Sequence, residues 1–368
     1  MSRHRTGESP ILTTMTGSSG FGLCRRRRAH GWWAKAVTGT VIAVLCLCSR
    51  KPAGVSRTFF RMGFAVRVTL VEEPQSEGLW ARVDSLLLDW DRRFSGSGEF
   101  SEVLRVNMRE SEGVAVSPEL FEMVRTGVAY GDPLEGWFDI TILPIKEAWG
   151  FGDGDTALTI PDSERLERLL RMVDRRLVHV DSGGSLSLRF DSASTRIDIG
   201  GIAKGFVIRA LGSLLHGEGE EDFLIEAGGD IFVSGRRAGG GPWRIGIRHP
   251  RRRGLLAVIR LDSGSVVTSG DYEQYYLHAD QRIHHIFDPR TGRSCNENRS
   301  VTIASPDPAD ADILSTGLFC LPADSIVSFV EARPRLECLV VDGEGGVWAS
   351  EAWRGSLDIV DSTARVSW

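Results

Sequence analysis

The spacing of apolar residues predicts three helices in the first half of the chain. Between residues 74 and 94 apolar positions recur every three or four residues, which is the period of one face of an amphipathic helix. A second helix is predicted from Ser117 to about residue 130, because Ser117, Pro118 and Glu119 supply an N-cap, a proline at the first helical position and an acid in the first turn. A third helix opens at residues 161–164.

Short apolar segments separated by glycine and Asp or Asn clusters predict strands from residue 223 onward. They lie at 223–227, 230–235, 243–247, 255–261, 265–269, 282–287 and 300–305. Two helices, at 308–321 and 322–333, precede a last pair of strands around 336–341 and 345–350. Strands joined by such turns are typical of antiparallel sheets. We therefore predict a compact, two-lobed α+β unit with mainly antiparallel sheets and flanking helices.

The first 57 residues have a different pattern. Four arginines at 25–28 precede a mostly apolar run at 34–48, which is shorter than a membrane-spanning helix needs. We predict that residues 1–57 form an export or membrane-anchor leader and that residues 58–368 form the folded domain. A disordered leader behind a wrongly chosen start codon is the alternative. Cys48 is a candidate for lipidation, although Leu45-Cys46-Leu47 before it is a poor lipoprotein signal.

Composition narrows the possible functions. A chain of 368 residues with 42% hydrophobic and 25% charged residues is an ordinary globular protein. Its formal net charge of −5 gives no support for nucleic-acid binding. Three of the six cysteines lie in the leader, and Cys295, Cys320 and Cys338 lie in the domain. Their spacing matches neither a disulfide framework nor a metal site, so we expect them to be buried or incidental.

The stretch D-I-G-G-I-A-K-G (198–205) is the first of four candidate sites. The preceding S-T-R-I predicts the end of a strand, and the following residues have helical spacing. Backbone N–H groups at such a helix start attract anions, and Lys204 adds a positive charge. Asp198 would repel a bare phosphate, so a metal or a neutral hydrogen-bonding group suits it better. A purely structural turn is the alternative.

The second and third candidates are A-G-G-D (227–230) and R-I-H-H-I-F-D-P-R-T-G (282–292). The A-G-G-D stretch is either part of a site or a tight hairpin in which Asp230 caps its own turn. In the 282–292 stretch, alternation along a strand would place the His284 and His285 side chains on opposite sides. Asp288 is close enough in sequence to orient the His285 ring, as in a base–orienter pair. Histidines satisfied at the surface are the alternative.

The fourth candidate is D-P-A-D-A-D-I-L-S-T-G-L (307–318). Asp312 and Thr316 are four residues apart and share one face of the predicted helix. A carboxylate and a hydroxyl are hard oxygen ligands of the kind that Mg²⁺ takes, with water and substrate phosphate completing its shell. Asp307 and Asp310 are better explained as N-terminal acids stabilised by the helix dipole.

Taken in order, these stretches resemble the ApbE family, the FAD:protein FMN transferases. The resemblance covers about residues 60–350, and the ordered set of motifs is highly specific, although each motif alone is ordinary. Its other parts are R-M-G-F near Met62, F-S-G-S-G-E-F-S-E-V-L-R-V-N (94–107), W-F-D-I-T-I-L-P-I-K-E-A-W-G-F-G (137–152), G-P-W-R-I-G-I-R-H-P (241–250) and V-T-S-G-D-Y-E-Q-Y (267–275).

The resemblance implies a cleft that binds FAD and Mg²⁺ and moves the FMN half of FAD to a threonine of an acceptor flavoprotein, releasing AMP. The residues expected to contact FAD are Met62, Ser97, Trp137, Phe138, Asp139, Asp198, Lys204 and His285. The implied metal ligands are the Gly201 backbone carbonyl and the Asp312 and Thr316 side chains. A threonine hydroxyl needs a base to become an effective nucleophile, and His285, oriented by Asp288, is our candidate.

Two departures from the family pattern leave alternatives open. Gly96 and Ser97 stand where many transferases have an aromatic residue, and Glu226 stands where asparagine usually precedes A-G-G-D. One alternative is a Mg²⁺-dependent FAD pyrophosphatase, in which water replaces threonine and the products are FMN and AMP. Another is a non-catalytic FAD-binding lipoprotein. The resemblance also implies export to the periplasmic face of the inner membrane, with membrane association through the N-terminus.

Overall fold

The computed structural model describes residues 54–368, apart from residues 97, 153–157 and 280. Most of the predicted leader, the lipidation candidate Cys48 and the candidate FAD contact Ser97 therefore lie outside the described residues. The first strand, β1 (Val55–Arg61), begins three residues before the predicted domain boundary. Within the described ranges, no helix combines the length and apolar character needed to span a bilayer.

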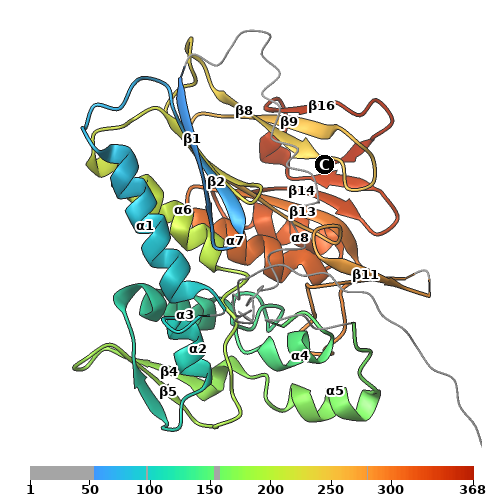
Figure 1. Ribbon diagram of the computed structural model, residues 1–368. Coiled ribbons are helices and arrows are strands. Elements are labelled where there is room, and N and C mark those ends of the chain that lie inside the picture. The colour runs from blue at the N-terminus through green and yellow to red at the C-terminus, as the bar shows by residue number, and fades with distance from the viewer. Residues whose placement is uncertain (1–53, 97, 153–157, 280) are drawn as a thin grey trace, which may run out of the picture. The chain divides into compact units, whose positions relative to one another are not determined.

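A nine-stranded sheet forms the centre of the fold (Figure 1). Its order is β1-β2-β6-β7-β10-β13-β14-β15-β17, and each neighbouring pair is antiparallel except β15–β17. The strands after β1 are β2 (Phe64–Leu70), β6 (Phe223–Ala227), β7 (Asp230–Ser234), β10 (Gly264–Gly270), β13 (Asn298–Ser305), β14 (Glu337–Asp342), β15 (Val347–Ala349) and β17 (Val366–Ser367). The predicted α+β class with mainly antiparallel sheets is confirmed.

Alternation of side chains along the strands gives this sheet two packed faces. On one face Val301 and Val340 pack with the helices α1 (Leu79–Phe94), α6 (Ala203–Gly217), α7 (Pro308–Gly317) and α8 (Ala323–Glu331). On the other face Ala304 and Leu339 pack against a small sheet of β8 (Trp243–Arg248), β9 (Leu255–Leu261) and β16 (Leu357–Ile359). The large sheet is thus the middle of three layers.

A second group of elements lies on the far side of the helices from the large sheet (Figure 1). It contains α2 (Glu102–Asn107), α3 (Pro118–Tyr130), α4 (Leu143–Ala148), α5 (Ser163–Leu170) and a sheet of β3 (Gly113–Ala115), β5 (Ser187–Phe190) and β4 (Val178–Asp181). Trp149, Phe151 and Phe287 form a separate apolar cluster here, joined by Tyr276 and Ile283 of the hairpin β11 (Tyr275–His278) and β12 (Gln281–His284).

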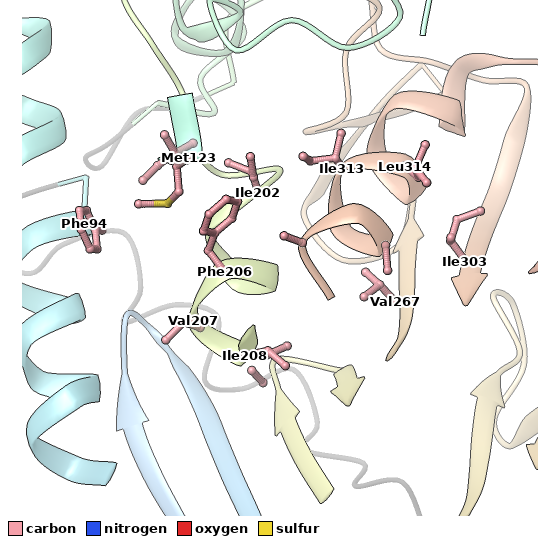
Figure 2. Close-up of a cluster of buried hydrophobic side chains, with 14 of the residues drawn as sticks. Phe94, Met123, Ile202, Phe206, Val207, Ile208, Val267, Ile303, Ile313 and Leu314 are labelled. Atoms are coloured by element: carbon pink, nitrogen blue, oxygen red, sulfur yellow. The ribbon is translucent and has the colours of Figure 1, made fainter. Parts of the chain in front are cut away.

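Gly205 lets α6 and α7 touch. A Cβ atom at this position would lie 2.6 Å from the Ala309 Cα and closer still to the Pro308 carbonyl oxygen. Around this crossing, Figure 2 shows Ile202 and Phe206 of the α6 segment beside Met123, with Ile313 of α7 across from them. The close approach brings the start of α6, which follows the glycine turn, against the helix that carries Asp312 and Thr316.

Most of the predicted elements are present. The first predicted helix is α1, which begins at Leu79, and the Ser117 hydroxyl caps α3 by accepting a hydrogen bond from the Leu120 amide at 3.3 Å. The third is α5, capped by Asp162. The fourth is α7, which continues into a 3₁₀ turn at Leu318–Cys320, and the fifth is α8.

The predicted strand at S-T-R-I is wrong. Residues 194–197 have no strand partner, because the Ile197 amide and carbonyl both bond to the Asn107 side chain, each at 2.8 Å. The next amide, of Asp198, donates to the Ile140 carbonyl at 2.6 Å. The Asn107 side chain and the Ile140 carbonyl, and not a neighbouring strand, thus hold this extended segment.

All three cysteines of the domain are buried, as one of the two expectations held, but the expectation that they form no disulfide is wrong for two of them. Cys295 and Cys320 form a disulfide that closes a sequence separation of 25 residues, with Cα atoms 5.1 Å apart. Both are almost fully buried, and Cys338 is buried and free. Cys320 reaches Cys295 only because the 3₁₀ turn after α7 packs beside the 284–295 segment, a contact that sequence spacing does not encode.

Candidate active site

The glycine turn before α6 and the middle of α7 form the centre of the candidate site. A Cβ atom at Gly201 would lie 3.2 Å from both the Thr316 Cγ2 and the Phe138 Cε2 atoms, so the turn lies directly against these two side chains. One helical turn before Thr316, the Asp312 Oδ2 atom accepts a hydrogen bond from the Gly205 amide at 2.9 Å. The structure therefore gathers the three predicted metal-ligand residues around the start of α6.

Lys204 reaches two buried carboxylates. It forms an ion pair with Asp230, and its charge also acts on Asp312. Burial raises the pKa of the Asp312 carboxyl and raises that of Asp230 to about 7, while Lys204 opposes both shifts. Burial lowers the pKa of Lys204, but the two carboxylates more than offset this and raise it above its usual value. One ammonium thus faces two buried carboxyl groups whose pKa values are raised, so a second cation beside them would favour their ionised forms.

The residues present fit a hard divalent cation. Asp312 offers a carboxylate, Thr316 a hydroxyl and Gly201 a carbonyl, and the Ser269 hydroxyl lies 3.4 Å from that of Thr316. Oxygen donors of this kind are what Mg²⁺ prefers. Among the described residues, no three His, Cys, Asp or Glu side chains gather in a metal-binding arrangement. A metal here would therefore use the mixed oxygen set.

The A-G-G-D stretch is a hairpin, as one of its two interpretations predicts. Gly228 and Gly229 form the turn between β6 and β7 with φ of 59° and 101°, values that favour glycine. The Asp230 carboxylate does not cap this turn but binds Lys204. The unusual Glu226 pairs with Arg67 on the neighbouring strand β2, with 3.5 Å between the charged atoms, so its charge is compensated.

Asp198 is paired with a cation that the sequence did not single out. The Lys146 ammonium of α4 donates to the Asp198 Oδ2 atom at 2.5 Å, and the Gly200 amide donates to Oδ1 at 3.1 Å. The two side chains are only 17% and 18% exposed. Asp198 therefore holds the glycine turn to α4 and presents a neutralised surface to the site.

The prediction that Asp288 orients His285 is wrong. The Asp288 carboxylate instead accepts hydrogen bonds from the Arg290 amide at 2.9 Å and from the Arg290 guanidinium at 3.0 and 3.2 Å, which closes the D-P-R-T-G turn. The His285 Nδ1 atom lies 3.3 Å from the Gln274 carbonyl oxygen. Because a carbonyl can only accept, Nδ1 carries the proton and Nε2 carries the free lone pair.

The two adjacent histidines differ in burial, but their predicted placement on opposite sides of a strand is wrong, because β12 ends at His284 and the two ring centroids lie only 6.5 Å apart. His284 is buried, and its Nε2 atom donates to the Cys295 carbonyl at 2.5 Å, whereas His285 is partly exposed. Desolvation lowers the pKa of His285 to about 3, and the nearby charge of Lys146 acts in the same direction. His285 is therefore neutral at physiological pH, with Nε2 available to accept a proton.

The expected flavin or adenosine contacts occupy three segments. Met62 lies in the β1–β2 turn with φ of 52°, and its amide donates to Asp91 at 2.7 Å. A hollow of about 320 Å³ opens beside it, between Gly63, Asp91 and Phe100. Phe138 is buried against the glycine turn.

Trp137 and Asp139 are already engaged by protein groups. The Arg290 guanidinium lies 3.1 Å from the centre of the Trp137 ring, a cation–π contact that joins the D-P-R-T-G turn to this segment. Asp139 accepts hydrogen bonds from the Thr141 amide at 2.8 Å, the Thr141 hydroxyl at 2.6 Å and the Arg175 amide at 2.9 Å. Its carboxylate thus shapes the segment and leaves little capacity for a ligand.

Four residues of the site were missed from the sequence. Asp230 was given only a local role in its hairpin, and Lys146 lies in the 137–152 stretch, which supported the resemblance but in which Lys146 was given no chemistry. Ser269 and Gln274 both belong to V-T-S-G-D-Y-E-Q-Y, a stretch that supported the resemblance but was given no chemistry. A polar or charged residue inside such a motif is the signal that could have indicated them.

Comparison with known proteins identifies the family. A model described as the ApbE family matches residues 62–340. The chain is 29% identical over 335 residues to the FAD:protein FMN transferase of Vibrio cholerae serotype O1, covering 88% of this chain and 98% of that relative. It is also 29% identical over 307 residues to the protein of the same name from Klebsiella pneumoniae, covering 82% and 87%.

Solved structures agree with this match. The ApbE protein of Thermotoga maritima aligns with a TM-score of 0.76 and 29% identity, covering 82% of this chain and 99% of that chain. The flavin transferase ApbE of Vibrio cholerae aligns with a TM-score of 0.74 and 27% identity, covering 83% and 99%. By its fold and by these relatives the protein is an α+β transferase. It belongs to the ApbE family.

Proposed function

We propose that this protein catalyses the Mg²⁺-dependent transfer of the FMN moiety of FAD to a threonine hydroxyl of an acceptor flavoprotein, with release of AMP. The observation that carries the proposal is the cluster in which Gly201 lies against Thr316 while Asp312 and Asp230 share the single charge of Lys204. An anionic pyrophosphate would be repelled by this cluster unless a divalent cation bound with it. Relatives that carry the transferase name support the choice of reaction.

The reaction balances as a displacement at phosphorus. The threonine oxygen bonds to the flavin-side phosphorus, and the P–O bond to AMP breaks with its electron pair leaving on AMP. The product is a phosphodiester between FMN and the acceptor, and the hydroxyl proton passes to a base. When bound, Mg²⁺ would neutralise the pyrophosphate and stabilise the charge that builds on the leaving AMP.

His285 is the proposed base, with Gln274 in the orienting role that the sequence gave to Asp288. The Gln274 carbonyl fixes the Nδ1–H tautomer, so Nε2 accepts the proton. A pKa of about 3 makes the free imidazole a weak base. The negative charge of bound FAD would raise that pKa toward the range in which general bases work. Lys146 keeps Asp198 neutralised, so that this carboxylate does not repel the nucleotide.

The proposal includes export, with the domain acting on the periplasmic side of the inner membrane and associated with it through the N-terminus. The basic and apolar pattern of residues 1–57 supports this, and so does the Cys295–Cys320 disulfide, since structural disulfides persist in oxidising compartments. Fractionation of cells that express the full chain, with thiols trapped at lysis, tests it. Export predicts an oxidised, membrane-associated protein, and a reduced cytosolic protein would contradict it.

A pair of variants on one helix tests the activity. Asp312→Asn removes the carboxylate of the cluster, whereas Asp310→Asn changes an acid two residues away that is hydrogen-bonded to Tyr130. With FAD, Mg²⁺ and an acceptor domain, we expect Asp312→Asn to lower AMP release and acceptor labelling at least 100-fold and Asp310→Asn to change both by less than 3-fold. AMP release without labelled acceptor would indicate hydrolysis, and FAD binding without AMP release would indicate a non-catalytic protein.

A further inference from the structure

We propose that the Cys295–Cys320 disulfide is a positioning element of the active site, and that FMN transfer is fast only when this bond is formed. The bond joins the segment that carries the proposed base, His285, to the helix that carries the proposed metal ligand Thr316. The activity part of this inference rests on the proposed function.

Each cysteine is the last residue of one of the two segments that the disulfide joins. Cys320 is the last residue of the 3₁₀ turn that continues α7, four residues after Thr316. On the other side, the Cys295 amide donates to the Ile286 carbonyl at 3.1 Å, and a β-bridge joins Phe287 and Ser294. Residues 284–295 are thus a tight loop whose two ends lie side by side, and the disulfide attaches the end of this loop to the 3₁₀ turn that follows α7.

His284 is held from both halves of the disulfide. Its Nε2 atom donates to the Cys295 carbonyl, and its ring lies edge-on to that of Phe319, the residue before Cys320, with centroids 5.4 Å apart. The Ile286 amide donates to His284 Nδ1 at 3.3 Å, so this ring is neutral and fixed in one tautomer. The position of the backbone just before His285 therefore depends on the contact between this loop and the 3₁₀ turn, which the disulfide maintains.

Loss of the bond should loosen the loop without unfolding the domain. The Asn298 side chain donates to the Phe319 and Leu321 carbonyls at 2.8 and 2.7 Å, so the end of α7 stays attached to β13. On the loop side, the contact that remains across to this turn is the one between the His284 and Phe319 rings, and the Trp149 indole holds the other part of the loop by donating to the Gly292 carbonyl at 2.7 Å. The expected effect is a less well-placed His285, which lowers turnover more than FAD binding.

Formation of the bond is a thiol oxidation. Two cysteine thiols lose two protons and two electrons and form one S–S bond, and the electrons pass to a disulfide oxidant, such as a protein disulfide of an exported oxidoreductase or oxidised glutathione. Both cysteines are 6% exposed or less. A bond so deeply buried forms during folding and then persists, so it acts as a fixed part of the site in an oxidising compartment.

The matched variants are Cys295→Ala/Cys320→Ala, which lacks the bond, and Cys338→Ala, which removes a buried thiol that forms none. In the full chain we expect the double variant to lose at least 10-fold in kcat, to keep its KM for FAD within 2-fold and to retain its near-UV circular dichroism. Hydrogen exchange in residues 284–295 should accelerate at least 10-fold, with exchange in α6 unchanged. Cys338→Ala should match the wild type. Refolding in dithiothreitol, which keeps the cysteines reduced, should give a slow wild type and leave the double variant unchanged.

Three results would overturn the inference: no Cys295–Cys320 peptide in non-reducing maps of the exported protein, unchanged kcat and exchange in the double variant, or a fall in kcat accompanied by loss of the tertiary dichroism. The last would make the bond a stabiliser of the fold alone. A wild-type protein that transfers no FMN in either redox state would refute the proposed function, and hydrogen exchange would still decide whether the bond holds the loop.

Discussion

The Lys146 ammonium donates to the Asp198 carboxylate at 2.5 Å and so ties α4 to the glycine turn that opens α6. The pair is 52 residues apart in sequence and less than one-fifth exposed. The same ammonium contributes to the low pKa of His285. One cation on a six-residue helix thus pairs with one residue of the proposed FAD site and acts on the pKa of another.

Replacing Lys146 by methionine, which has a similar length and no charge, should leave Asp198 unpaired. We expect a loss of up to about 3 kcal/mol in the free energy of unfolding, because removing one partner of a largely buried pair strands the other. We also expect a rise in the pKa of His285, measured by NMR titration of its ring protons. Lys146→Arg should restore much of the stability. Equal losses in both variants would show that the charge is not what matters.

The crossing of α6 and α7 should tolerate no side chain at position 205. Gly205→Ala places a Cβ within 2.6 Å of backbone atoms of α7, which cannot move aside easily, so we expect a loss of about 3 kcal/mol or more. Gly217→Ala is the matched control, since a Cβ there meets no atom within 4 Å at the other end of the same helix. Denaturant unfolding measures both variants, and similar stabilities would contradict the account of this crossing.

His285→Ala should separate binding from turnover. The ring is proposed to act chiefly as the proton acceptor, and its contact with FAD is one of several, so we expect kcat to fall by about 100-fold or more while the dissociation constant for FAD changes less than 3-fold. His179→Ala, at an exposed histidine paired with Asp191, is the control. Normal turnover in His285→Ala would remove this residue from the mechanism.

The pH dependence of stability should include a contribution from Asp342. Partial burial raises its pKa, but hydrogen bonds from the Trp348 indole and the amides of Gly346, Gly345 and Glu344 outweigh this and lower it. A lowered folded-state pKa means that the charge stabilises the fold above the unfolded value of about 3.9. That stabilisation is lost as the pH falls through the folded value.

Asp342→Asn should therefore cost about 1–2 kcal/mol at pH 7 and progressively less as the pH falls below 4. Parallel urea titrations of the two proteins across this range measure the difference. A difference that stays constant with pH would mean that the charge of Asp342 contributes nothing.

The sequence correctly predicted those elements that are determined by residues close together in the chain. The cap at Ser117 and the two-glycine turn before Asp230 are examples. The strands β1 and β2 were not predicted. In β1, an edge strand, four of the seven residues are exposed, so the alternation that indicates a half-buried strand is weak.

The sequence predicted which residues belong to the candidate site better than it predicted which residues they pair with. Asp312 and Thr316 follow from helical spacing, and Gly201 follows from the resemblance. The partners did not follow, because each lies on a distant segment: Gln274 for His285, Lys146 for Asp198 and Cys320 for Cys295. Such contacts arise from how the helices and loops pack, which spacing along one segment does not determine.

The most direct test of the central claim is the intact mass of an acceptor domain after incubation with FAD and the full chain, with Mg²⁺ or with EDTA. With Mg²⁺ the account predicts an acceptor heavier by one FMN less one water, with the addition on a threonine and one AMP released for each. With EDTA, and with Asp312→Asn in Mg²⁺, it predicts an unchanged mass. Labelling that persists in EDTA, or AMP and free FMN beside an unmodified acceptor, would contradict it.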